Sequence, residues 1–210
     1  MFFENTSVYN IENAMRGMRN PMNSWKKSDS YGNEVGPNDL ELLKKLVKAG
    51  PEHRKCLRQI FISVDITAPL YWWKEFDTYK IGTAANSTST MHKLATTPIT
   101  EECFELRDYN ERLTLIDDQH LGVRISQWID DLEQLRQKYL ITKDKRYWKE
   151  LIRWLPEGWL QTRTVTMNYE NVLNMILQRK SHKLVEWSED FISWATNLPL
   201  MEVILKEVEK

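Results

Sequence analysis

The sequence predicts a helix-rich α+β protein that contains a small, mostly antiparallel sheet. Residues 58–66 alternate apolar and polar side chains, which is typical of a strand with one buried face. Residues 125–139 carry apolar side chains at helical spacing, and further helical patterns flank them. The 210 residues include only 7 Gly and 7 Pro, too few for a linker-dominated chain. We therefore expect one domain over residues 1–210, with the sheet built mostly from its N-terminal half.

The first half of the chain predicts a helix, a strand and a second helix. Residues 1–35 leave strand, short helix and loop all open. Asn38 and Asp39 resemble a helix cap, and Gly50-Pro51 would end that helix. Its apolar face would carry Leu40, Leu43, Leu46 and Val47. After the strand at residues 58–66, Pro69 suits the start of a helix over residues 69–80.

Residues 81–90 are mostly small and rich in hydroxyl groups, and they are poor in apolar anchors. This composition predicts a loop. One interpretation is a linker. The other is an active-site loop whose backbone approaches a ligand closely.

The second half of the chain is predicted to be mainly helical. Residues 103–155 are expected to form helices, with a break at residues 143–145. An extended run follows Leu155-Pro156. Asn168 would cap a helix that ends near Arg179, and Pro199 would interrupt the last helix.

Composition and charge narrow the function classes. The net charge is -1 with 28% charged residues, so nucleic acid and anionic membranes are not expected partners. No stretch reaches the ~18 apolar residues of a membrane span, and no signal-peptide pattern opens the chain. The two cysteines have no CxxC spacing, and the four histidines have no metal-ligand spacing. We expect a soluble cytoplasmic protein with no metal site and no disulfide framework.

Tryptophan is unusually frequent. The chain has nine, two of them adjacent at Trp72-Trp73. Trp buries much area per residue, so core and subunit contacts are the simplest interpretation. Stacking of one or two of them on a flat cofactor or base stays open.

Seven positions in residues 150–182 occur in a distinctive order. They are Glu150, Arg153, Leu155-Pro156, Asn168, Asn174, Arg179 and His182. This order resembles the C-terminal half of the flavin-dependent thymidylate synthases, in which Glu-x-x-Arg and Leu-Pro precede an Asn-headed helix that ends in an essential Arg. One residue is missing before Leu155 and another between Arg179 and His182. The resemblance implies the fold of that family.

The resemblance also implies roles for these residues. Arg179 would be the catalytic cation that polarises a uracil ring, because a fixed guanidinium stabilises negative charge building on ring oxygens. Arg153 would help to grip the nucleotide. Asn168, Asn174 and His182 would contact or border FAD. The simpler alternatives are an ordinary C-terminal helix charge for Arg179, a helix cap for Asn168, a surface amide for Asn174 and a loop histidine for His182.

The N-terminal half departs from the family pattern. Pro69-Leu70-Tyr71 matches its opening, but Lys74-Glu75-Phe76 replaces Arg-Gln-aromatic and Thr78-Tyr79-Lys80 replaces Arg-His-Arg. Thr88 keeps the hydroxyl expected further on. In this register Glu75, Lys80 and Thr88 would border the substrate and Tyr79 the flavin. Lys80 retains one charge without the planar fork of Arg, and Glu75 adds a negative charge near an expected phosphate.

The expected function therefore differs from that of a typical member of the resembling family. The chain would bind FAD, a pyrimidine nucleotide resembling dUMP, or both, as a homo-oligomer, in the family a tetramer. Activity of the thymidylate synthase type, a methyl transfer, would also require NADPH and methylenetetrahydrofolate, and the lost charges imply that it is altered or absent. The alternative is a non-catalytic interaction or assembly protein on the same scaffold, with Trp-rich surfaces that bind a partner.

Overall fold

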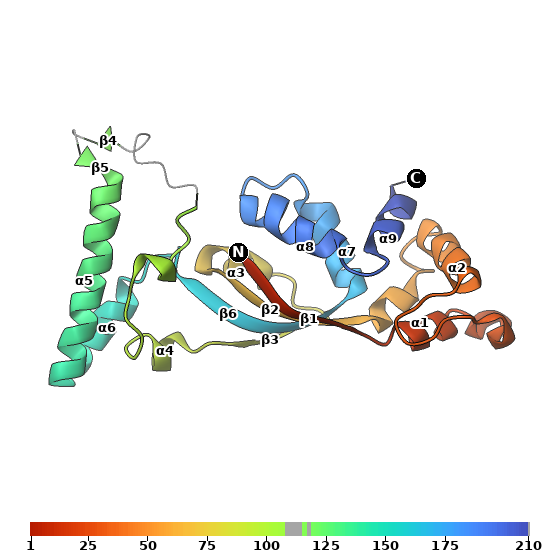
Figure 1. Cartoon of the computed structure of the whole chain (residues 1–210), viewed down its shortest axis with the longest axis horizontal. Coiled ribbons are helices and arrows are strands. Elements are labelled where there is room, and N and C mark those ends of the chain that lie inside the picture. Colours follow the sequence, from red (N-terminus) through yellow and green to blue (C-terminus); the bar gives the residue numbers. More distant parts are fainter. Residues whose placement is uncertain (108–114, 117–118, 210) are drawn as a thin grey trace. The chain divides into compact units, whose positions relative to one another are not determined.

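A computed structural model of the chain describes residues 1–107, 115–116 and 119–209. Its central feature is a four-stranded antiparallel sheet with strand order β1-β2-β6-β3 (Figure 1). The strands are β1 (Phe2–Tyr9), β2 (Phe61–Pro69), β3 (Ala84–Ser87) and β6 (Leu160–Asn168). Helices make up much of the remaining chain. The predicted helix-rich α+β fold with a small antiparallel sheet is confirmed.

The register of β2 against β6 is fixed at both ends of the pair. The backbone N–H of Leu70 donates to the Trp159 carbonyl at 3.0 Å, and that of Tyr169 donates to the Ile60 carbonyl at 3.0 Å. In β2 the side chains of Ile62, Val64, Ile66 and Ala68 are fully buried, which confirms the predicted alternation. A slip by one residue would move this whole row to the other face, so burial specifies the register.

The chain forms two compact units. Unit 1 contains Met1, Thr67–Asp77 and Ser87–Arg163, and unit 2 contains Phe2–Ile66, Thr78–Asn86 and Thr164–Lys210. The strands β2 and β6 each contribute residues to both.

Unit 1 is organised around a helical pair. Its elements are α3 (Leu70–Phe76), α4 (Thr90–Lys93), η4 (Glu101–Cys103), the short pair β4 (Leu115–Ile116) and β5 (Gln119–His120), α5 (Leu121–Thr142) and α6 (Lys145–Arg153). The helices α5 and α6 pack against each other. Their interface belongs to a core of Leu94, Ile99, Phe104, Ile129, Leu132 and Leu151. The predicted break between the two helices is confirmed at Lys143 and Asp144, where the Asp144 carboxylate caps α6.

Unit 2 contains the helices from both ends of the chain. They are α1 (Ile11–Gly17), η1 (Asn20–Met22), η2 (Trp25–Lys27), α2 (Pro37–Lys48), η3 (Lys55–Gln59), α7 (Tyr169–Arg179), the π-helix η6 (Glu186–Phe191), α8 (Ile192–Thr196) and α9 (Met201–Val208). α2 packs against α9, and α7 packs against η3 and α8. Pro199 separates α8 from α9, as predicted.

Two local predictions in the first half were wrong. The helix predicted over residues 69–80 ends at Phe76, and the chain then turns. Residues 81–90 were predicted to be a loop, but Ala84–Ser87 form strand β3. The edge of β6 supplies the hydrogen bonds that this segment needs, although its only apolar residues are two alanines, which do not signal a strand. Tertiary pairing therefore overrides composition here.

Two helix boundaries also differ from the prediction. α2 begins at Pro37, so Asn38 and Asp39 lie inside its first turn; the Asp29 carboxylate accepts from both of their N–H groups. The helical prediction for residues 103–155 fails at residues 104–107, where Phe104 instead forms an isolated bridge with Trp159. It also fails at Leu115–Ile116 and Gln119–His120, which form the strands β4 and β5. Residues 108–114 and 117–118 of that prediction lie outside the described residues.

The Trp72-Trp73 pair belongs to the core of unit 1. Trp72 is 0% and Trp73 1% exposed, and both pack against Phe76 with ring centroids 5.1 and 5.3 Å away. The indole N–H of Trp73 donates to the Gln161 carbonyl at 2.9 Å. Burial removes both rings from any ligand surface, so the core interpretation holds for this pair.

Within the described part of the chain, no helix combines the length and apolarity needed to cross a membrane.

Candidate functional site

Arg179 is the last residue of α7, where the helix dipole favours a positive charge. Its Nε donates a 2.8 Å hydrogen bond to the phenolic oxygen of Tyr79. The same phenol donates to Oε1 of Gln178 at 3.0 Å. One hydroxyl thus links two adjacent residues at the end of the helix, and this linkage orients the guanidinium.

Trp187 supports Arg179 from a second direction. The guanidinium carbon lies 4.9 Å from the centroid of the Trp187 ring, within the range of a cation–π contact worth roughly 1–2 kcal/mol when partly desolvated. Trp187 is 0% exposed and packs edge-on against Phe191 at 5.1 Å. It lies in the π-helix η6, a helical form that often occurs at functional sites. A rigid aromatic wall therefore fixes a half-buried cation.

His182 follows Arg179 closely and lies near the same ring. Its centroid is 6.5 Å from that of Trp187. Its backbone N–H donates to the Arg179 carbonyl at 3.0 Å, and its Nδ1 accepts from the backbone N–H of Leu184 at 3.2 Å. In the neutral imidazole, Nε2 then carries the proton, so this nitrogen is a donor. We call Tyr79, Gln178, Arg179, His182 and Trp187 the Arg179 cluster.

A tight turn after Tyr79 contacts the N-terminal part of α7. The side-chain amide of Asn171 donates to the Ile81 carbonyl at 2.7 Å. Gly82 has a φ of +76°, and a Cβ there would lie 2.9 Å from both Asn168 Nδ2 and Asn171 Oδ1. Only glycine fits this combination of backbone conformation and close approach. The hydroxyl of Thr83 donates back to the Tyr79 carbonyl, which closes the turn.

Asn168 is the N-cap of α7, as the sequence predicted. Its side chain accepts from the Asn171 N–H at 2.9 Å, while the Asn171 side chain accepts from the Asn168 N–H at 3.4 Å. This reciprocal capping box engages oxygen atoms of both amides. The cap does not test the predicted flavin contact of Asn168.

One face of α7 carries amides that sequence reasoning did not select. Asn171 contacts the turn after Tyr79, and Gln178 contacts the phenol of Tyr79 itself. The half-buried Asn174 lies between them on the same helical face, because positions i, i+3 and i+7 align along a helix. That spacing is visible in the sequence and would have identified Asn171 and Gln178. No sequence signal singled out Trp187 as a partner of Arg179.

The other predicted site residues are distributed over both units. Lys80, in unit 2, follows Tyr79 directly and is exposed. Unit 1 contains the remaining three. Glu75 is half-buried on α3, and the backbone N–H of Thr88 donates to the Thr162 carbonyl at 2.9 Å. Arg153 is half-exposed and forms an ion pair with Glu150. The structure therefore groups Tyr79, Arg179 and His182 directly.

The buried polar groups near η3 stabilise the fold and do not form a reactive site. Arg54 holds Glu170 through both of its carboxylate oxygens, with the closest contact at 2.8 Å. Burial raises the pKa of the neighbouring Cys56 thiol to about 12, so this thiol is protonated at neutral pH and is no nucleophile. Within the described ranges, no group of three or more His, Cys, Asp or Glu side chains could hold a metal ion.

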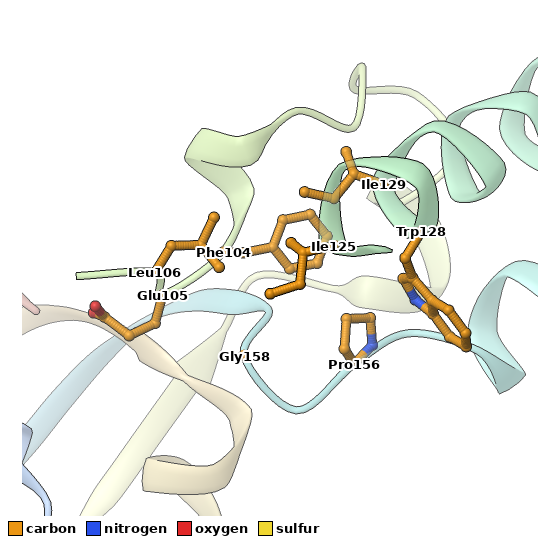
Figure 2. A pocket seen from close by; sticks show the side chains of 8 residues that line it. All are labelled: Phe104, Glu105, Leu106, Ile125, Trp128, Ile129, Pro156 and Gly158. Carbon is orange, nitrogen blue, oxygen red and sulfur yellow. The ribbon is translucent and has the colours of Figure 1, made fainter. Parts of the chain in front are cut away.

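Unit 1 contains an almost wholly apolar cavity of about 390 Å³ (Figure 2). Ile125, Trp128 and Ile129 of α5 face Pro156 across it, and Phe104 and Leu106 close another side. Trp128 is 43% exposed and meets Trp154, which is 51% exposed, edge-on at 6.0 Å. This unit therefore presents aromatic surface.

The fold described above is that of the flavin-dependent thymidylate synthases. The sequence matches no family model, and no curated protein sequence is similar enough to count as a match. Comparison with solved structures does find clear similarity, and it extends over the whole chain.

Two of these structures are of ThyX, the flavin-dependent thymidylate synthase of Helicobacter pylori, each with FAD and dUMP. One superimposes with a TM-score of 0.70 at 17% identity and covers 98% of this chain and 99% of the other. The second gives a TM-score of 0.68 at 16% identity, with both chains covered completely. Similarity at this level of identity establishes a shared fold.

Proposed function

We propose that this protein binds FAD and a pyrimidine nucleotide resembling dUMP, with the Arg179 cluster at the nucleotide base. The observation that supports the proposal is the placement of Arg179: a hydroxyl and an indole ring hold its guanidinium at a helix end, on a fold whose solved examples contain FAD and dUMP.

The chemistry of the cluster fits a uracil ring. The ring oxygens gain negative charge when C5 becomes reactive, and a preorganised cation stabilises that charge without reorganising. A guanidinium is charged at every physiological pH and offers a planar set of donors. In this proposal Arg179 is the catalytic residue. Arg153, Lys80 and Thr88 anchor the nucleotide, and Glu75 borders it.

The flavin contacts are assigned to Tyr79, Asn168, Asn174 and His182. Two observations support a fit to the flavin: Nδ1 of His182 accepts from the Leu184 N–H, which leaves Nε2 as the donor of a neutral imidazole, and Asn174 lies on the amide-bearing face of α7. A bound reduced flavin would supply the hydride for the reaction. The residues of this chain would bind and orient it, but Thr78-Tyr79-Lys80 provides less positive charge than Arg-His-Arg. We therefore expect weakened or absent methylation, which would also need NADPH and methylenetetrahydrofolate.

The test is an absorbance spectrum of the purified protein, followed by thermal shifts with FAD, dUMP and both. A yellow protein, or a shift with FAD that grows when dUMP is added, supports the proposal. A ligand at 100 times its Kd stabilises the folded state by about 2.7 kcal/mol, which such a scan resolves readily. If neither FAD nor dUMP shifts the transition of a colourless protein, the proposal fails.

A second candidate function is assembly without catalysis. The exposed edge-on pair Trp128 and Trp154 beside the apolar cavity favours it, because exposed aromatic surface commonly marks an interface. A homotetramer would agree with both candidates. Light scattering separates them when combined with the ligand scan: a defined oligomer that binds neither ligand supports assembly alone, and a monomer that binds FAD excludes it.

A further inference from the structure

A second cavity, of about 460 Å³, lies in unit 2 between η2 and α2. Its character is opposite to that of the apolar cavity, because charged side chains dominate it. The polar residues that line it are Arg19, Lys26, Lys27, Asn38, Glu41 and Lys45. None of them belongs to the Arg179 cluster.

Arg19 is the buried member of this set, and its partner uses only part of its guanidinium. Nε of Arg19 donates to Oδ1 of Asp39 at 2.7 Å. The second oxygen of Asp39 is already occupied, since Ser28, Asp29 and Ser30 all donate to Oδ2 at 2.8–3.2 Å. The two-pronged pairing typical of Arg with a carboxylate is therefore not formed.

This arrangement leaves a donor of Arg19 unused. Nη2 of Arg19 is buried and has no hydrogen-bond partner among the described residues, and the side chain as a whole is 6% exposed. A buried charged donor without an acceptor costs free energy that a suitable ligand would restore. Arg19 also lines the cavity, so an acceptor bound there would lie beside a guanidinium whose hydrogen bonds are incomplete.

The charge around the cavity selects the kind of ligand. Four cationic side chains line it. Lys45 is paired with the lining carboxylate of Glu41 at 2.6 Å and Arg19 with the adjacent carboxylate of Asp39, so the surplus charge is that of Lys26 and Lys27. The N-terminus of α2 adds little, because the Asp29 carboxylate already accepts from the N–H groups of Asn38 and Asp39 at 2.9 and 3.0 Å. The excess positive charge therefore comes from side chains. The exposed Lys26 and Lys27 have flexible stems that can close on an anion.

We propose that this cavity binds a phosphate group, with Arg19 as the buried cation and Lys26 and Lys27 as its mobile charges. A phosphate group offers several acceptor oxygens and up to two negative charges, which match the unused guanidinium donor and the surplus of cations. The group can belong to free inorganic phosphate or to a small phosphate monoester. The site is independent of the proposed function, because it shares no residue with the Arg179 cluster.

The test is a calorimetric titration of the full chain with inorganic phosphate, at constant ionic strength balanced with chloride. We expect saturable binding that weakens by about tenfold, or about 1.4 kcal/mol, in the double variant Lys26→Ala/Lys27→Ala. Both lysines are exposed, so folding should be unaffected. The matched control is Lys48→Ala/Lys55→Ala, which removes the same charge from exposed positions outside the cavity lining and should bind as the wild type does.

Glycerol 3-phosphate in the same titration distinguishes the two sources. Binding of both compounds supports a site for phosphate monoesters, and binding of inorganic phosphate alone supports a site for the free ion. Equal heats with chloride, or unchanged phosphate affinity in the lysine double variant, would overturn the proposal. Arg19→Lys, checked for folding by circular dichroism, should also weaken binding because it removes the buried fork of donors.

Discussion

Arg179 and Tyr79 are 100 residues apart in the sequence, and a 2.8 Å hydrogen bond joins the guanidinium of one to the phenol of the other. In the register that the sequence resemblance implies, Tyr79 would occupy the central position of the triplet that replaces Arg-His-Arg. In that register a neutral hydroxyl would replace an imidazole, and the hydroxyl orients Arg179 by accepting a hydrogen bond.

Replacing Tyr79 tests whether this orientation matters. Tyr79→Phe keeps the ring and removes the oxygen that Arg179 and Gln178 share. We expect stability to fall by about 1 kcal/mol, the net value of such a bond, and dUMP affinity to fall several-fold. Urea unfolding and calorimetry measure the two quantities. Unchanged dUMP affinity in a well-folded variant would show that the phenol does not position Arg179.

Gly82 is expected to be the least replaceable glycine of the site. Gly82→Ala adds a Cβ at 2.9 Å from the amides of Asn168 and Asn171, at a φ of +76°. Gly32→Ala is the matched control, because its φ is +58° but nothing lies within 4 Å of the added Cβ. Both changes carry the conformational cost of roughly 1 kcal/mol, and only Gly82→Ala should lose stability beyond it. Equal losses by thermal unfolding would refute the close-approach argument.

Asn168 has a structural role and a proposed binding role, and two substitutions separate them. Asn168→Ala removes the cap of α7 and should cost about 1 kcal/mol. Asn168→Asp keeps a capping oxygen at the positive end of the helix and should retain the stability. If the amide contacts flavin, FAD affinity falls in both variants. A normal FAD affinity in Asn168→Asp would show that Asn168 acts only as the cap of α7.

The ion pair between Glu133 and Arg136 in unit 1 predicts a pH dependence. The hydrogen bonds from Arg136 lower the pKa of Glu133 to about 2, despite the opposing effect of burial, and the Ile99 N–H adds to them. A folded-state pKa below the unfolded value stabilises the protein above about pH 4.5, by roughly 2–3 kcal/mol. This contribution disappears as the pH falls toward 2.

Denaturant unfolding between pH 2 and 6 measures this effect. Glu133→Gln should flatten the dependence of the unfolding free energy on pH between 4.5 and 2, whereas Glu102→Gln, at an exposed position of the same unit, should leave it unchanged. Identical pH profiles for the wild type and Glu133→Gln would contradict the assignment.

The sequence contains strong local signals for some parts of this fold and none for others. The alternation in β2 and the Asn cap of α7 are local patterns, and both were predicted correctly. β3 has only two alanines as apolar residues and all of its side chains are exposed, because pairing with β6 rather than burial makes it a strand. Likewise, the resemblance selected Arg179, but no local pattern could reveal that Trp187 lies beneath it. Such contacts depend on tertiary packing.

The central claim is that Arg179 binds a ligand rather than only ending a helix. The most direct test is calorimetric titration of dUMP, with FAD present, into the wild type, Arg179→Gln and Arg58→Gln, the last being a control at an exposed position of unit 2. We predict saturable binding to the wild type and the control. Arg179→Gln should bind at least about tenfold more weakly, with an unfolding free energy within about 1 kcal/mol of the wild type. Equal dUMP affinity in all three proteins, or no binding to the wild type, would contradict the claim.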